Sequence, residues 1–252
     1  MPLAGLQEII EPARAAGRGV GAFNVIGIEH AEAIVTGAED AGAPTVLQVS
    51  ENCVAYHGAL APIAGACLAI ARAAAVPVAV HLDHATSTDL VRAAAGLGLG
   101  SVMFDASGLP YEQNVAATAE MAAWCHDRGL WVEAELGEIG GKNGVHAALA
   151  RTDPAEAAGY VAATGVDALA VAVGSSHAML TRDAVLDVGL ITAIARAVSV
   201  PLVLHGSSGV PDADLAADAG LVDPRKYGAA GRAAIAPEVA RLLGVLGAGT
   251  RR

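Results

Sequence analysis

Short apolar stretches alternate with longer alanine-rich stretches along most of this chain. The short stretches have the length of buried parallel strands, and the longer ones have the length of helices. Seven strands are predicted, at residues 20–25, 45–50, 78–84, 101–107, 131–136, 168–174 and 201–206. Helices are predicted to follow them, for example at residues 29–41, 88–97 and 154–163, with Ser87 and Asp153 as N-caps and Pro154 at a first helical position.

This alternation predicts an α/β fold of the TIM (β/α)8 barrel type, in which each strand is followed by a covering helix. The 252 residues fit one such domain, residues 1–252, because these barrels take roughly 250 residues. The eighth strand is missing from the sequence. No β-rich stretch lies between Leu215 and a last predicted helix at about residues 229–246.

Composition and charge narrow the range of partners. Of the residues, 54% are apolar and only 3% aromatic, so the core must be built from Ala, Val, Leu and Ile. The formal net charge of -11 disfavours nucleic acid and anionic membranes, which leaves a small molecule as the expected partner. The three cysteines are irregularly spaced and are expected to be reduced thiols. The sequence shows neither a secretory leader pattern nor a long apolar span, so a cytoplasmic protein is predicted.

Three of the eight histidines stand at the ends of predicted strands. His84 ends the third strand, His177 follows the sixth, and His205 ends the seventh. In barrels the active site lies at the carboxyl ends of the strands, so three imidazoles there predict a catalytic divalent metal site. Any one of them alone could be a histidine bonded to backbone. His81, within the third strand, is interpreted as a packed residue or one that supports a ligand.

Carboxylates occur at the same strand ends. Asp83 precedes His84, Asp105 ends the fourth strand, and Glu133 and Glu135 share one face of the fifth because side chains alternate along a strand. By the same alternation Asp83 and His84 begin on opposite faces, although a turn at the strand end can bring both toward one ligand. Buried carboxylates of this kind bind metal, support a histidine or move protons; a structural ion pair is the alternative.

Two Gly-Ser-Ser triplets, at residues 174–176 and 206–208, follow the sixth and seventh strands. Glycine lets backbone N–H groups approach an anion and serine adds a hydroxyl donor, so their placement on late strands favours a phosphate site. The chain has only two lysines, Lys142 and Lys226, and neither lies in a predicted strand. A Schiff base therefore has no good candidate, and carbanion stabilisation is expected from a metal.

The sequence resembles the class II fructose-bisphosphate aldolase family, including its tagatose-bisphosphate and other ketose-bisphosphate branches. The resemblance runs in family order over about residues 7 to 212. The matching stretches are GAFNV at 21–25, QVSEN at 48–52, HLDH at 81–84, SVMFDAS at 101–107, VEAELG at 132–137, TGVD at 164–167, GSSH at 174–177 and HGSSG at 205–209.

This resemblance implies a role for each matching residue. It implies zinc held by His84, His177 and His205, with Asp105 and Glu135 as carboxylates near the metal, and Asp83 as the proton donor and acceptor at the C4 oxygen. Positions that match the substrate and phosphate site, where the family often binds a monovalent cation too, are Asn24, Ser50, Gly174, Gly206 and Ser207. The implied reaction is reversible cleavage of fructose or tagatose 1,6-bisphosphate to dihydroxyacetone phosphate and an aldehyde, by a homodimer or homotetramer.

Two departures from the family pattern leave alternatives open. The loop at residues 140–146 lacks the family's acidic residues, so the base that acts on dihydroxyacetone phosphate is unassigned. The missing eighth strand leaves a non-catalytic, zinc-binding relative as the main alternative. A metal-dependent hydrolase on a similar barrel is a third possibility, disfavoured by the two Gly-Ser-Ser triplets.

Overall fold

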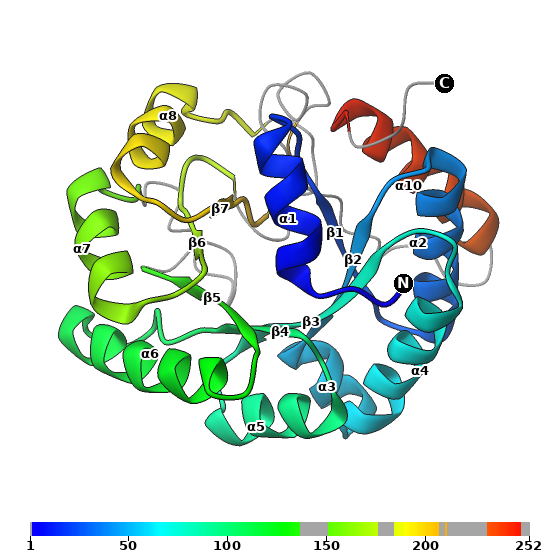
Figure 1. Ribbon diagram of the computed structural model, residues 1–252, viewed down its shortest axis with the longest axis horizontal. Coiled ribbons are helices and arrows are strands. Elements are labelled where there is room, and N and C mark those ends of the chain that lie inside the picture. Colours follow the sequence, from blue (N-terminus) through cyan, green and yellow to red (C-terminus); the bar gives the residue numbers. More distant parts are fainter. Residues whose placement is uncertain (1, 137–150, 176–183, 207–209, 211–230, 248–252) are drawn as a thin grey trace. The chain divides into compact units, whose positions relative to one another are not determined.

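The computed structural model describes residues 2–136, 151–175, 184–206, 210 and 231–247 (Figure 1). It divides into two compact units: residues 1–102 together with 223–252, and residues 103–222. The seven strands form one sheet whose order follows the chain, β1-β2-β3-β4-β5-β6-β7. The pairs β1–β2, β2–β3, β5–β6 and β6–β7 are parallel, as the alternation of strands and helices requires.

The first unit contains three complete strands with their helices. Its strands are β1 (Gly21–Asn24), β2 (Thr45–Ser50) and β3 (Val78–Ala85), and β4 (Ser101–Phe104) begins in it. Its helices are α1 (Leu6–Ala15), α2 (Ile28–Ala41), α3 (Glu51–His57), α4 (Leu60–Ala73), α5 (Thr88–Leu97) and α10 (Gly231–Val245). The predicted N-cap at Ser87 is confirmed, because its hydroxyl accepts a hydrogen bond from the Leu90 N–H at 3.3 Å.

Helix α10, although last in the chain, packs against α2 (Figure 1). Gly37 is buried on the contacting face of α2. A Cβ atom built there would lie 2.4 Å from the carbonyl oxygen of Ala236 and 2.7 Å from the Cβ of Val239. The two helices therefore approach more closely than any residue with a side chain at position 37 would allow.

The second unit contains β5 (Trp131–Glu135), β6 (Ala168–Ala170) and β7 (Leu202–Val203), with the helices α6 (Tyr111–His126), α7 (Pro154–Thr164) and α8 (Val188–Ala197). Asp153 caps α7 as predicted, accepting from the N–H groups of Ala155 and Glu156. A buried polar network lies beneath the end of β5. In it the Tyr160 hydroxyl lies 2.8 Å from Asn114 Oδ1, and the Asn114 amide donates to the carbonyl oxygens of Glu135 and Leu136.

All seven predicted strands are present, but several end earlier than predicted. β4 ends at Phe104, β6 at Ala170 and β7 at Val203, each before the end that the apolar pattern predicts. No eighth strand occurs among the described residues, and residues 211–230, where the sequence lacks one, lie outside them. The prediction of one domain stays a prediction.

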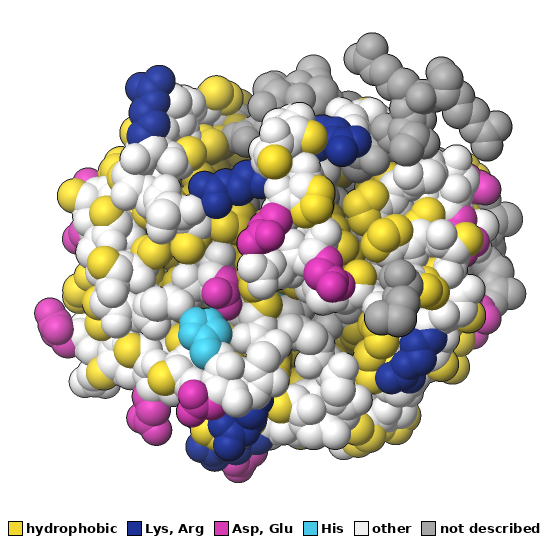
Figure 2. Space-filling model, viewed as in Figure 1, with side chains coloured by type: hydrophobic (Ala, Val, Ile, Leu, Met, Phe, Trp, Pro, Cys, Tyr) yellow, Lys and Arg dark blue, Asp and Glu magenta, His cyan; other side chains and the backbone are white. Residues whose placement is uncertain are grey.

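No single helix in the described ranges is long and apolar enough to cross a membrane; only α3 and α4 together pass that test, as a pair bent by 113°. Lys and Arg side chains lie apart from one another on the face shown in Figure 2, interspersed with Asp and Glu. The described residues on that face form no continuous basic patch of the kind that binds nucleic acid.

Candidate active site

In the first unit, polar side chains line one face of the sheet. Asn24 pairs in register with Gln48, and Gln48 pairs with His81. Two residues further on, Ser50 pairs with Asp83. Neighbours in parallel register share a face and so do positions i and i+2, so these five residues lie on the same side of the sheet.

The opposite face of the same three strands is apolar. It carries residues such as Phe23, Leu47 and Leu82, all of them buried. The polar face is therefore the candidate side for binding or chemistry. Sequence reasoning did not select Gln48; the register with Asn24 and His81 is the signal that finds it.

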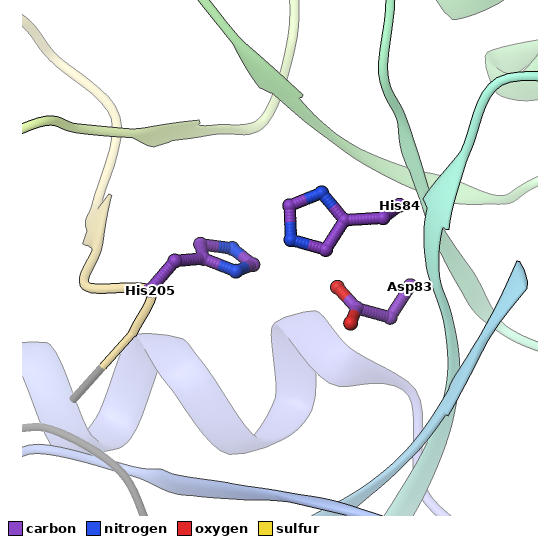
Figure 3. Close-up of side chains that lie close together, drawn as sticks. All are labelled: Asp83, His84 and His205. Carbon is purple, nitrogen blue, oxygen red and sulfur yellow. The ribbon is translucent and has the colours of Figure 1, made fainter. Parts of the chain in front are cut away.

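His84 breaks the alternation of β3. It is the one residue other than glycine with a positive φ among the described residues, at 49°. The left-handed conformation costs a residue with a Cβ about 1–3 kcal/mol and redirects its side chain. As a result Asp83 and His84, adjacent in sequence, extend from β3 on the same side (Figure 3). Both are buried.

Polar contacts on either side of His84 hold the ends of β2 and β3. Glu51 accepts hydrogen bonds from the backbone N–H and the hydroxyl of Thr86, just beyond β3. Ser50, predicted to line the substrate site, accepts from the Cys53 N–H at 3.2 Å and thereby caps α3. Its hydroxyl proton remains available for a second partner.

His81 Nδ1 lies 3.0 Å from the hydroxyl of Ser101, which makes His81 a packed, hydrogen-bonded residue as expected.

Asn24 ends β1 and is partly exposed. Its amide oxygen is buried and has no hydrogen-bond partner among the described residues. A buried amide oxygen without a partner costs about 1–3 kcal/mol, so such an atom is usually kept for a ligand or a water molecule. The observation supports the prediction that Asn24 lines a binding site.

In the second unit, buried acidic side chains stand at the ends of the strands. Asp105 follows β4 and is 5% exposed; its Oδ1 accepts from the N–H and the hydroxyl of Ser107. Glu135 ends β5 and is 1% exposed. Glu133, two residues earlier on the same face, approaches His205 Nε2 with its Oε1 at 2.7 Å. His205 is 3% exposed, and its carbonyl oxygen accepts from the Ser175 hydroxyl at 2.6 Å.

The two glycines of the predicted phosphate site, Gly174 and Gly206, differ in their surroundings. Gly174 has a φ of 120°, and a Cβ there would lie 2.2 Å from the carbonyl oxygen of Val185. Only glycine fits this position, and packing against the chain itself already explains the requirement. Gly206 follows His205 with a φ of 66°. His177, Ser207 and the loop at residues 140–146 lie outside the described residues.

The three cysteines lie in the interior of the protein. Cys53, Cys67 and Cys125 are buried and free, as the prediction of reduced thiols requires. Burial raises the pKa of Cys67 to about 12 and that of Cys125 to about 11, so both are protonated near neutral pH.

These features are those of a candidate metal site on an α/β fold. Buried imidazole and carboxylate side chains, the usual donors to a metal ion, occur in both units: Asp83 and His84 in the first, and Asp105, Glu135 and His205 in the second. Oxygen and nitrogen donors of this kind are the ligands of catalytic divalent ions such as zinc.

Comparison with known proteins identifies the family. The family model for class II fructose-bisphosphate aldolase matches residues 4–222. A fructose-bisphosphate aldolase from Giardia intestinalis is 38% identical over 216 residues, which cover 84% of this chain and 67% of the relative. One from Staphylococcus aureus is 36% identical over 219 residues, covering 85% of this chain and 77% of the relative.

A solved structure agrees with these sequence relatives. The YdjI aldolase from Escherichia coli K12 is 28% identical, with a TM-score of 0.84 over 98% of each chain. The chain belongs to the class II fructose-bisphosphate aldolase family. It is therefore a carbon–carbon lyase on a TIM-type α/β fold, as the sequence predicted. Membership implies a phosphorylated sugar as substrate and dihydroxyacetone phosphate as a product.

Proposed function

We propose that this chain catalyses reversible, zinc-dependent cleavage of fructose 1,6-bisphosphate or tagatose 1,6-bisphosphate. The products are dihydroxyacetone phosphate and an aldehyde such as glyceraldehyde 3-phosphate. The observation that carries the proposal is the end of β3, where the left-handed backbone at His84 directs Asp83 and His84, both buried, to the same side. A metal ligand next to a proton acceptor is the pairing that this cleavage needs.

We propose His84, His177 and His205 as the zinc ligands, with Asp105 and Glu135 as nearby carboxylates. The donor set fits zinc, because buried imidazoles supported by carboxylates are typical of its sites. The hydrogen bond between Glu133 and His205, 2.7 Å long, is a support of this type. Bound zinc would supply Lewis-acid stabilisation of the negative charge that develops on a substrate oxygen.

Asp83 is proposed as the base that removes the proton from the C4 hydroxyl group. When that proton moves to the carboxylate, a C4 carbonyl forms and the C3–C4 bond breaks. Its electron pair stays on the three-carbon fragment, which becomes dihydroxyacetone phosphate once the former C3 takes up a proton. In the direction of synthesis Asp83 returns the proton. Its burial suits this task, since it is only 4% exposed and bulk water does not compete for the proton.

The polar face of β1 and β2 is proposed to bind the sugar. The Asn24 amide oxygen can accept from a substrate hydroxyl, and the Ser50 hydroxyl can donate to a substrate oxygen while it caps α3. Gly174, Gly206 and Ser207 are proposed to bind a phosphate group, together with a monovalent cation. A homodimer or homotetramer is proposed as the working form, to be tested by light scattering.

The test is release of dihydroxyacetone phosphate from each of the two bisphosphates, followed with a coupled dehydrogenase. The protein is assayed as purified, after removal of metal with a chelator, and after zinc is added back. We expect cleavage that is lost with the chelator and restored by zinc, and a loss of at least about a hundredfold in His84→Ala.

Two results would refute this proposal. Cleavage that survives complete removal of metal would exclude the zinc mechanism, as would full activity in His84→Ala. Stoichiometric zinc binding without cleavage of either bisphosphate would instead favour a non-catalytic member of the family. The ratio of activities on the two substrates identifies the preferred configuration at C4.

A further inference from the structure

The hydrogen bond between Glu133 and His205 lies wholly within the second unit and is almost completely buried. Glu133 Oε1 lies 2.7 Å from His205 Nε2, and the two side chains are 5% and 3% exposed. A buried carboxylate is costly unless it is hydrogen-bonded or paired, so this contact stabilises a group that would otherwise destabilise the fold. Its cost suggests that Glu133 is kept for a purpose other than packing.

The two residues come from strands that are not neighbours. Glu133 lies on β5 and His205 follows β7, with β6 between them, so about 10 Å separates the two backbones. Glu133 pairs in register with Ala168, and Ala170 pairs with Val203. The residues of β6 on the face of Glu133 are therefore both alanines, whose small side chains leave room for the glutamate and the imidazole to meet above β6.

His205 is fixed at a second point. Its carbonyl oxygen accepts a hydrogen bond of 2.6 Å from the buried Ser175, so the backbone is held while Glu133 holds the ring. A carboxylate accepts hydrogen bonds, so the ring presents N–H at Nε2. In the neutral imidazole the lone pair then lies on Nδ1, which is the ring nitrogen that can donate to a metal.

We propose that Glu133 is a positioning residue, which holds His205 in the Nε2–H tautomer and directs Nδ1 to the metal. This inference rests on the proposed role of His205 as a zinc ligand. It gives Glu133 a task distinct from that of Glu135, two residues away on the same strand, which is proposed to lie near the ion itself. Loss of such an outer partner typically weakens metal binding by about 10- to 100-fold.

The test replaces Glu133 by glutamine, which keeps its size but can donate as well as accept and so no longer enforces one tautomer. The zinc dissociation constant is measured by competition with a chromophoric chelator. We expect Glu133→Gln to bind zinc at least about tenfold more weakly, and the visible absorption bands of the cobalt-substituted protein to change. A smaller change in zinc affinity, or an unchanged cobalt spectrum, would overturn the inference.

Two further variants show whether a change in zinc affinity comes from the contact between Glu133 and His205. Glu120→Gln removes an exposed carboxylate from α6 and should bind zinc like the original protein. His205→Ala tests the proposed function itself. If it retains zinc affinity, His205 is not a ligand; if it loses affinity while Glu133→Gln keeps it, only the role of Glu133 is wrong. Melting temperatures of the metal-free variants show whether each is folded.

A measurement on the unaltered protein covers the case in which Glu133→Gln does not fold. Nitrogen-15 NMR of histidine-labelled, metal-free protein distinguishes the two neutral tautomers, and the His205 signals are assigned by their loss in His205→Gln. We expect the Nε2–H tautomer at position 205. Observation of the Nδ1–H tautomer would overturn the inference.

Discussion

Gly37, on the face of α2 that packs against α10, allows a direct test of that contact. Alanine at this position would place its Cβ 2.4 Å from the Ala236 carbonyl oxygen and 2.7 Å from the Val239 Cβ. Both distances are well inside van der Waals contact, and one of the atoms is backbone, so the helices must move apart. Overpacking of this kind costs about 1–3 kcal/mol, partly offset by the roughly 0.5–1 kcal/mol that alanine gains over glycine in a helix.

We therefore expect Gly37→Ala to lower the free energy of unfolding by about 1–2 kcal/mol and the melting temperature by several degrees. Gly65→Ala in α4 is the matched control, because nothing lies within 4 Å of the Cβ it would add. That variant should gain stability. Urea unfolding followed by circular dichroism measures both. If Gly37→Ala is as stable as Gly65→Ala, the close approach of α2 and α10 is wrong.

Three other predictions concern single side chains. Asp83→Asn should lower the cleavage rate by about 10²- to 10⁴-fold with unchanged zinc content, because an amide cannot accept the proton. The coupled assay and metal analysis check this prediction, and a rate within tenfold of the original would contradict it. Tyr160→Phe removes the hydroxyl 2.8 Å from buried Asn114 Oδ1 and should cost about 1–3 kcal/mol in urea unfolding, whereas an unchanged midpoint would show that the network contributes little. Cys67, whose pKa burial raises to about 12, should resist iodoacetamide at pH 8 in the folded protein and react readily in urea, as peptide mass spectrometry would show; rapid labelling in the folded state would refute its burial.

The sequence predicts best what is local. Ser87 and Asp153 cap their helices as expected, because an N-cap depends on a side chain and the next three residues. The apolar stretches locate all seven strands for the same reason. Their carboxyl ends are less certain, since apolar residues continue past Ala170 after β6 has left the ladder, and pairing with a neighbouring strand decides where a strand ends.

Some residues of the candidate site could be predicted from the sequence, and others could not. Asp83 and His84 could be selected because polar residues at the end of an apolar strand stand out. The left-handed backbone that turns His84 could not be read from the sequence. Neither could the contact between Glu133 and His205, since it depends on the register of three strands and on small residues in the middle one. Gln48 was missed because it looks like an ordinary polar residue until its register with His81 is known.

The first unit is built from both ends of the sequence, and this affects how the chain folds as it is made. Residues 1–102 leave the ribosome early, but their partner α10 emerges only after the whole of the second unit, residues 103–222. Until then the face of α2 around Ile34 and Gly37 has no α10 to cover it. The second unit is continuous in sequence and can fold during synthesis, whereas the first must wait.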